Sequence, residues 1–274
     1  MPAIAASENG RLVAIASRDR ARAEEVASRH GFAHVDESYQ AVVEDPEVDA
    51  VYIPLVNSLH KEWTLRAVAA GKHVLCEKPL AMNAVEAEEM GAAAERAGVR
   101  LMEAFMYRFH PRPRDFIQAL REPMYVAASF GFSFHKPENY RMKKELGGGA
   151  LLDVGCYTVS VARWILGEPD GVAAWARGGE VDMTVNALLH FPGGATAAVW
   201  ASFEAPEEQE LTVVTRDGRQ RLERPFSSKE PDPYRLMVES FAESVMQDGP
   251  VAIPVADSIA NMRVLDRIAE AAGI

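Results

Sequence analysis

The sequence predicts a two-part protein: an α/β part built on a parallel sheet, followed by an α+β part with an open antiparallel sheet. Up to about residue 105, short apolar runs alternate with helical stretches. This alternation is typical of parallel strands covered by helices on both faces. After about residue 120, longer strand-like runs are separated by Pro-Gly-Gly at 192–194 and by Asp217-Gly218. Such turn residues are typical of hairpins.

The elements of the first half follow from this alternation. Apolar runs predict strands at 11–16, 49–55, 72–79 and 99–105. Helical composition that ends at a glycine predicts helices at 18–30, 58–71 and 83–98. Sheets of this kind bind ligands at the carboxyl ends of their strands. The loops to inspect are therefore 17–18, 55–60, 77–79 and 103–108.

The second half reads as strands with a few helices. Strands are expected at 124–134, 171–179, 183–205 and 209–226. A helix over 151–167 follows three glycines and should run over the sheet. Two more helices are expected at 232–248 and 257–273, the last beginning with the capping pair Asp257-Ser258.

Composition excludes several classes of protein. The chain has 274 residues and a formal net charge of -11, so nucleic-acid or anionic-membrane binding is not expected. Its two cysteines, Cys76 and Cys156, are far apart, which argues against a disulfide framework, a structural zinc or any other metal site. We see no apolar run of the roughly 18–20 residues that a membrane span needs and no signal-peptide pattern. A cytoplasmic protein is the default expectation.

One pair of polar residues stands out at the start of the apolar helix 151–167. Asp153 and Tyr157 are four residues apart, so both side chains project from one helix face. Spacing alone leaves two interpretations open. Asp153 could be a residue near the helix N-terminus with Tyr157 in the core, or the pair could be part of a functional site.

The start of the chain lacks an expected motif. A doubly wound α/β domain usually begins with a strand, a G-x-G-x-x-G loop and a helix, and its ribose-binding residue lies roughly 20 residues later. Residues 11–19 read as a second strand, and no glycine precedes Gly10. We therefore expect the first strand and the Gly-rich loop to be missing. A start assigned too far downstream, or an N-terminal helix of an unrelated fold, are the alternatives.

Four stretches together resemble the Gfo/Idh/MocA oxidoreductase family. They are 52–60, 71–90, 103–111 and 147–167, and the resemblance extends over the whole chain. The most similar branch contains NADP-dependent D-xylose dehydrogenases, dihydrodiol dehydrogenases and glucose-fructose oxidoreductase. The resemblance implies a truncated Rossmann-type dinucleotide-binding domain over 1–106 and an α+β substrate and dimerisation domain over 107–256. The helix 257–274 would then pack back on the first domain.

The resemblance also implies a catalytic group. Lys78, beside a cis peptide bond to Pro79, would supply a fixed positive charge that lowers the pKa of Tyr157 and stabilises an oxyanion. Tyr157 would be the general acid or base that exchanges a proton with the substrate hydroxyl. Asp153 would bind a substrate hydroxyl or orient Lys78.

Cofactor contacts are implied at the strand ends. Glu77 would contact the nicotinamide ribose, although it could merely pair with a cation. Arg108 would approach the nicotinamide, with a structural salt bridge as the alternative. Further contacts are expected from the turn after the strand 49–55, where some residues could instead be helix caps; they are Leu55, Asn57 and His60.

Ser17 and Arg18 decide which cofactor is expected. An NAD enzyme would place a carboxylate here for the ribose 2'-hydroxyl, whereas a hydroxyl followed by a guanidinium suits a 2'-phosphate. NADP is therefore favoured over NAD, even though Asp19 comes next.

The expected function is hydride transfer between NADP and a CH–OH group of a sugar or cyclic diol. A homodimer is expected through the sheet face that carries 195–203. Two alternatives stay open. One is a truncated homologue that has lost cofactor binding and catalysis, and the other is an NAD-linked sugar or inositol dehydrogenase.

Overall fold

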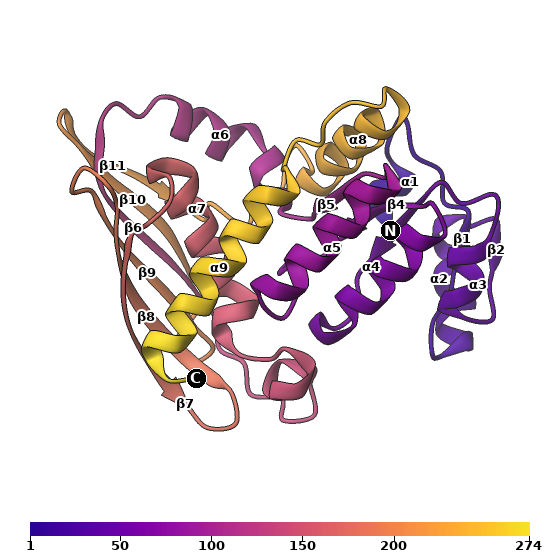
Figure 1. Cartoon of the computed structure of the whole chain (residues 1–274), viewed down its shortest axis with the longest axis horizontal. Helices are drawn as coiled ribbons and strands as arrows, with labels where there is room; N and C mark the ends of the chain where they lie inside the picture. The colour runs from indigo at the N-terminus through magenta and orange to yellow at the C-terminus, as the bar shows by residue number, and fades with distance from the viewer.

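Short parallel strands flanked by helices form the first half of the chain (Figure 1). The computed structural model describes all residues, 1–274. Two parallel sheets are present, and they are not hydrogen-bonded to each other: β1 (Ala14–Ile15) with β2 (His34–Val35), and the three-stranded sheet of β3 (Ala50–Ile53), β4 (His73–Cys76) and β5 (Leu101–Glu103). The expected parallel α/β arrangement is confirmed.

Capping residues mark the ends of several helices in this half. They are α1 (Pro2–Ala5), α2 (Arg20–His30), α3 (Tyr39–Glu44), α4 (His60–Ala69) and α5 (Ala84–Ala97). Asn83 caps α5 by accepting a hydrogen bond from the Glu86 amide. Gly98 ends α5 with φ of 67°, a conformation that costs least for a residue without a Cβ. Strand β2 and helix α3 were not expected, because they are too short to show a hydrophobic period.

The second half is built on one six-stranded sheet. Its strands are β6 (Pro123–Gly131), β7 (Gly171–Gly178), β8 (Asp182–His190), β9 (Thr196–Ser202), β10 (Glu208–Thr215) and β11 (Gly218–Glu223). They lie in the order β11-β10-β6-β9-β8-β7.

The sheet is mixed, so the expectation of a purely antiparallel sheet was wrong in one pairing. Strand β6 runs parallel to β9, from Tyr125 opposite Thr196 to Gly131 opposite Ser202. The reason is the connection after β6. The chain leaves the sheet, returns at the far edge as β7 and reverses direction twice through hairpins, so β9 arrives beside β6 with the same direction.

Helices cover one face of this sheet and leave the other free (Figure 1). Helix α7 (Cys156–Leu166) packs on β6 and β9, and α9 (Val255–Ala272) packs on β7 and α7. Helix α6 (Pro111–Gln118) follows the first half directly, and α8 (Pro233–Met246) packs near α1. Side chains of β4, α7 and the sheet belong to one apolar core, for example Val74, Val159 and Val199.

Helix α9 joins the two halves. A Cβ added at Gly91 of α5 would lie 3.2 Å from the side chains of Val255 and Ile259, so the two helices pack closely. The helix begins at Val255, two residues before the expected Asp257-Ser258 cap. Pro254 is the N-cap, so Asp257 lies in the first turn, where its carboxylate pairs with Arg108 and Arg163.

One segment, 144–166, is long and apolar enough to span a membrane by length and composition, contrary to the expectation that none exists. Within the fold, 78% of its most apolar window is buried. The segment carries α7, which the sheet and α9 cover, so it has the burial of a core helix.

Candidate active site

The turn after β4 carries the first half of the site. Lys78 and Pro79 are joined by a cis peptide bond, as expected. The buried carboxylate of Glu103, at the end of β5, holds the turn by accepting a hydrogen bond of 2.8 Å from the Leu80 amide. His60 holds the turn from the side through a 2.9 Å contact between its Nδ1 and the Pro79 carbonyl oxygen.

The helix with Asp153 begins in an unusual way. Residues Leu151–Gly155 form a π-helical turn before α7, a feature that often marks functional sites. Asp182 of β8 accepts a 2.7 Å hydrogen bond from the Leu151 amide and so caps this turn. A Cβ at Gly149 would lie 2.0 Å from Asp182 Oδ1, and Gly149 has φ of +107°. A glycine is therefore required at position 149 so that the Asp182 carboxylate can reach the Leu151 amide.

Lys78 and Asp153 meet across the two halves. Lys78 Nζ donates to Asp153 Oδ1 at 3.0 Å and to the Asp153 carbonyl oxygen at 2.7 Å. Burial opposes the charge on Lys78, but the Asp153 carboxylate outweighs it and holds the lysine pKa well above its usual range. Asp153 therefore orients Lys78, which was one of its two expected roles.

Arg141 is a third member of this ion cluster, and sequence reasoning missed it. Its Nε donates to Asp153 Oδ2 at 2.7 Å. Burial raises the pKa of Asp153, but Lys78 and Arg141 together more than offset this effect, so the net pKa is lowered and the carboxylate is ionised. The residue lies in a 3-10 turn, Tyr140–Met142, in a loop with no periodic pattern to single it out.

Tyr157 lies one turn beyond Asp153. Lys78 Nζ lies over its ring, 5.1 Å from the centroid, and the phenol hydroxyl has no hydrogen-bond partner in the protein. Phe105, Phe130 and Phe226 pack around the ring. Burial raises the pKa of Tyr157 well above its usual value, while the Lys78 charge acts in the opposite direction as expected.

Glu77 also lies at the end of β4. It accepts a 2.5 Å hydrogen bond from the hydroxyl of Tyr52, a residue of β3 that was not expected in the site. Burial and the neighbouring Glu77 charge both raise the pKa of Tyr52. Glu77 is thus held by a neutral phenol rather than by a cation.

These groups line one cleft between the two halves, with a volume of about 490 Å³. This volume suits a small-molecule ligand. The first half contributes Tyr52, Pro54, Leu55, Val56, Asn57, Glu77 and Lys78. The second contributes aromatic walls and the polar groups described above: Phe130, Phe132, Tyr140, Arg141, Asp153, Val154, Tyr157 and Tyr234.

Two expected cofactor residues have structural partners instead. His60 is fully buried between the carbonyl oxygens of Pro79 and Leu55, and burial lowers its pKa while those two acceptors oppose the effect. Arg108 pairs with Asp257 and lies over the Trp164 ring at 4.8 Å. Neither residue lines the cleft.

The remaining expected residues are divided between the cleft and the edge of the first sheet. Leu55 lines the cleft, and so does Asn57, whose buried amide donates to the Gly147 carbonyl oxygen at 2.8 Å and ties the two halves together. Ser17 and Arg18 follow β1, away from the cleft lining. The Arg18 side chain is exposed and has no hydrogen-bond partner, which leaves its guanidinium free for a ligand.

The chain joins a domain of parallel strands and helices to a mixed-sheet domain. The cleft between them holds a lysine, a tyrosine and two carboxylates. This combination is typical of two-domain nicotinamide-dependent oxidoreductases. Residues 1–105 match an oxidoreductase family with an NAD-binding Rossmann fold, and residues 118–221 match the GFO/IDH/MocA C-terminal domain. The chain belongs to the Gfo/Idh/MocA oxidoreductase family.

Individual relatives are dehydrogenases, and one of them is named with NADP(+) as its cofactor. The chain is 40% identical over 301 residues to D-xylose 1-dehydrogenase (NADP(+)) 2 of Haloferax volcanii, covering 99% of this chain and 92% of the relative. It is 35% identical over 216 residues to trans-1,2-dihydrobenzene-1,2-diol dehydrogenase of Xenopus tropicalis, with 76% and 65% covered. The expected enzyme class and its NADP cofactor are confirmed at the level of these relatives.

Solved structures show the same architecture. The aldose-aldose oxidoreductase from Caulobacter crescentus complexed with glycerol has a TM-score of 0.91 and 27% identity, with 100% of this chain and 92% of that chain covered. KijD10, a 3-ketoreductase from Actinomadura kijaniata in complex with NADP and TDP-benzene, has a TM-score of 0.89 and 30% identity, with 99% and 92% covered.

Proposed function

We propose that this chain transfers hydride between NADP and a CH–OH group of a sugar or cyclic diol. The observation that carries the proposal is the meeting of Lys78, Asp153 and Tyr157 in one cleft, with Lys78 held by Asp153 at 3.0 Å and lying over the Tyr157 ring. The substrates named for the xylose and diol dehydrogenase relatives support the substrate class.

The residues present fit the two ends of the cofactor, the adenosine 2'-phosphate and the nicotinamide ribose. Arg18, exposed and unpaired after β1, would bind the 2'-phosphate together with the Ser17 hydroxyl. Glu77 and Leu55 would lie beside the nicotinamide ribose in the cleft. When bound, NADP supplies the hydride acceptor in oxidation or the hydride donor in reduction.

The protein's own residues handle the proton. In the oxidation direction, the phenolate form of Tyr157 takes the hydroxyl proton of the substrate and becomes the neutral phenol; the side chain lines the cleft where the substrate would bind. The Lys78 ammonium stabilises the phenolate of Tyr157 and the developing substrate oxyanion. Asp153 keeps Lys78 in place from the other domain. In reduction the same groups return the proton.

The activity test follows absorbance at 340 nm with NADP⁺ and a panel of D-xylose, D-glucose and trans-1,2-cyclohexanediol. We expect turnover that falls about 10²–10⁴-fold in Lys78→Ala, because the fixed charge is lost. Lys61→Ala is the matched control, since Lys61 pairs with Glu89 and does not line the cleft. Equal activity in the two variants would contradict the proposed site.

The same assay separates the alternatives. A chain without catalysis would show no turnover with any substrate, whatever affinity for NADPH a fluorescence titration gives. An NAD-linked dehydrogenase would show a higher kcat/KM with NAD⁺ than with NADP⁺.

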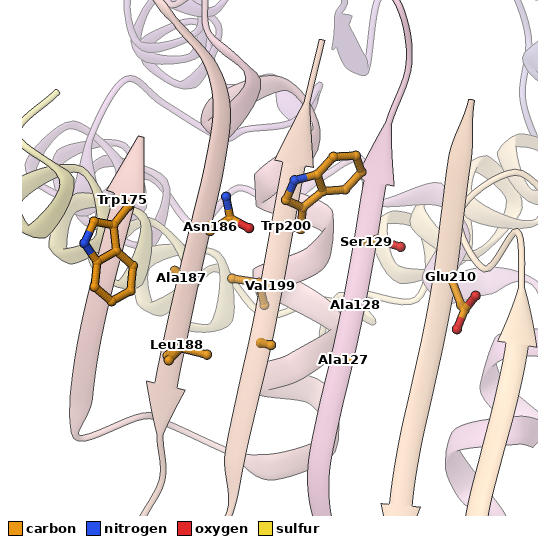
Figure 2. Close-up of a pocket in the computed structure, with 11 residues that line it drawn as sticks. Ala127, Ala128, Ser129, Trp175, Asn186, Ala187, Leu188, Val199, Trp200 and Glu210 are labelled. Carbon is orange, nitrogen blue, oxygen red and sulfur yellow. The ribbon is translucent and has the colours of Figure 1, made fainter. Parts of the chain in front are cut away.

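We also propose a homodimer through the free face of the second-domain sheet. Figure 2 shows Trp175, Leu188 and Trp200 on neighbouring strands of this face, around a shallow hollow of about 210 Å³. Trp175 is 62% exposed and Leu188 is 53% exposed. Large apolar side chains gathered on one surface are typical of protein interfaces.

The dimer is tested by light scattering after size-exclusion chromatography. Leu188→Glu would place a charge in the proposed interface and should give a monomer. Val85→Glu is the control, because Val85 is equally apolar, 62% exposed and located on α5 instead. A wild-type monomer, or a dimer unaffected by Leu188→Glu, would contradict this interface.

A further inference from the structure

The carboxylate of Asp153 contacts two cations from two different elements. Lys78, after β4, reaches Oδ1 at 3.0 Å. Arg141, from the 3-10 turn, reaches Oδ2 at 2.7 Å through Nε, and its Nη2 lies 3.4 Å from Oδ1. Asp153 is 4% exposed, so water screens these charges little.

The charge count of the cluster depends on Arg141. Lys78 and Asp153 alone would form a neutral pair, and a neutral pair offers little net field to a neighbouring phenol. Adding the Arg141 guanidinium gives the cluster a net charge of one positive unit. That surplus is available to Tyr157, because Lys78 Nζ lies 5.1 Å from the centre of its ring.

The structure fixes Arg141 in this position. Its carbonyl oxygen accepts a 2.9 Å hydrogen bond from the Gly149 amide, and a Cβ at Gly148 would lie 2.5 Å from the same oxygen. Its guanidinium lies over the rings of Tyr140 at 4.9 Å and Phe134 at 5.5 Å. The glycine stretch and two aromatic rings therefore hold the arginine against Asp153.

We propose that Arg141 is a positioning residue that balances the charge of Asp153, so that Lys78 keeps its own positive charge for the Tyr157 hydroxyl. This inference rests on the proposed function, in which Tyr157 exchanges the proton. In this inference Asp153 holds Lys78 in position, and Arg141 compensates the negative charge of Asp153.

Other charged or titratable groups face Tyr157, and all of them except Asp153, which the double variant changes, stay constant in the comparison that tests the proposal. They come from every element packed against it: Glu77 and Lys78 after β4, Tyr107 near β5, Tyr140 beside Arg141, Asp153 and Cys156 on its own helix, and Tyr234 on α8. Among them, only the Asp153 carboxylate bonds to both cations.

The test compares the pH dependence of kcat/KM in a charge cycle. Arg141→Met removes the surplus charge, so the midpoint of the Tyr157 ionisation should rise by about one pH unit, the lower end of what a nearby charge contributes. Arg141→Lys keeps the charge and should leave the midpoint near that of the wild type. In Asp153→Asn/Arg141→Met the net charge returns to that of the wild type, so the midpoint should return as well.

A merely structural arginine would behave differently. Arg141→Lys and Arg141→Met would then lower kcat without moving the midpoint, or the double variant would stay as displaced as Arg141→Met. Either result overturns the proposal.

A second measurement does not need turnover. The protein is labelled with 3-fluorotyrosine, whose phenol is more acidic than that of tyrosine, and the Tyr157 signal is assigned by its loss in Tyr157→Phe. Its ¹⁹F titration should move among the variants in the order given above. An unchanged titration, or a Tyr157 signal that does not titrate before the wild type unfolds, overturns the role of Arg141. Absence of NADP⁺ reduction by the wild type would overturn the proposed function separately.

Discussion

Replacing Glu103 with glutamine should stabilise the protein above pH 7 and change its stability little near pH 4. Glu103 ends β5, is 1% exposed, and accepts the Leu80 amide hydrogen bond below the Lys78–Pro79 turn. Burial raises its pKa from the ordinary 4.5 to about 7, against the opposing effects of Ser258 and the Leu80 amide. A glutamine keeps the size and the acceptor oxygen but cannot ionise.

The direction of the effect follows from the raised pKa. Below about pH 4.5, Glu103 is protonated in both the folded and the unfolded chain, so ionisation contributes no difference. As the pH rises toward 7, the unfolded chain ionises first and the wild type loses stability. A pKa difference of about 2.5 units at 1.36 kcal/mol per unit gives a penalty of about 3 kcal/mol above pH 7.

The assay is urea unfolding followed by tryptophan fluorescence at several pH values from 4.5 to 8. The free energy of unfolding of Glu103→Gln should exceed that of the wild type by about 3 kcal/mol at pH 8, with the gap closing toward pH 4.5. Glu95→Gln, an exposed position on α5, is the control and should show no such trend. A gap that stays constant with pH would refute the reasoning, because it could not come from ionisation.

Three other predictions test the site directly. Tyr157→Phe should lower kcat by about 10²–10⁴-fold in the 340 nm assay; a loss below about tenfold would mean that another group carries the proton. Arg18→Ala should weaken NADPH binding by about tenfold or more in a fluorescence titration while leaving NADH binding unchanged, and an equal effect on both would remove Arg18 from the 2'-phosphate site. Gly149→Ala should lower the free energy of unfolding by about 1–3 kcal/mol or more, because of its φ and the Asp182 contact, whereas Gly249→Ala, in open space, should not; equal values would contradict the required glycine.

Much of the candidate site could be predicted from the sequence because its residues follow recognisable elements. Glu77 and Lys78 come directly after an apolar strand and before a proline, and Asp153 and Tyr157 begin an apolar helix after three glycines. The position of these residues relative to predicted strands and helices was therefore enough to identify them as candidates. The parallel α/β arrangement was predicted for the same reason, since helix and strand periods alternate clearly there.

The missed or misplaced residues depend on contacts between distant segments. Arg141 belongs to a loop with several charges, and nothing local shows that it reaches Asp153. Asp182 begins a strand, yet it caps a helix 31 residues earlier. Arg108 follows the end of a strand, as the residues that line the cleft do. Its guanidinium instead donates a hydrogen bond to Asp257, 149 residues later in the chain. The prediction that all strands of the second sheet are antiparallel was wrong for a similar reason. The relative direction of β6 and β9 depends on where β7 enters the sheet, far along the chain from β6.

The π-helical turn at Leu151–Gly155 makes the proposed site sensitive to the length of the chain between Asp153 and Tyr157. Each residue advances an α-helix by about 100° around its axis, so the wide turn sets the angle at which Asp153 faces relative to Tyr157. Deleting Val154 or Gly155, which lie between Asp153 and Tyr157, would change the angle between the two side chains around the helix axis, so that both could not keep their present positions in the cleft. A change of length between Asp153 and Tyr157 would therefore move the carboxylate relative to the phenol, which a substitution that keeps the length does not do.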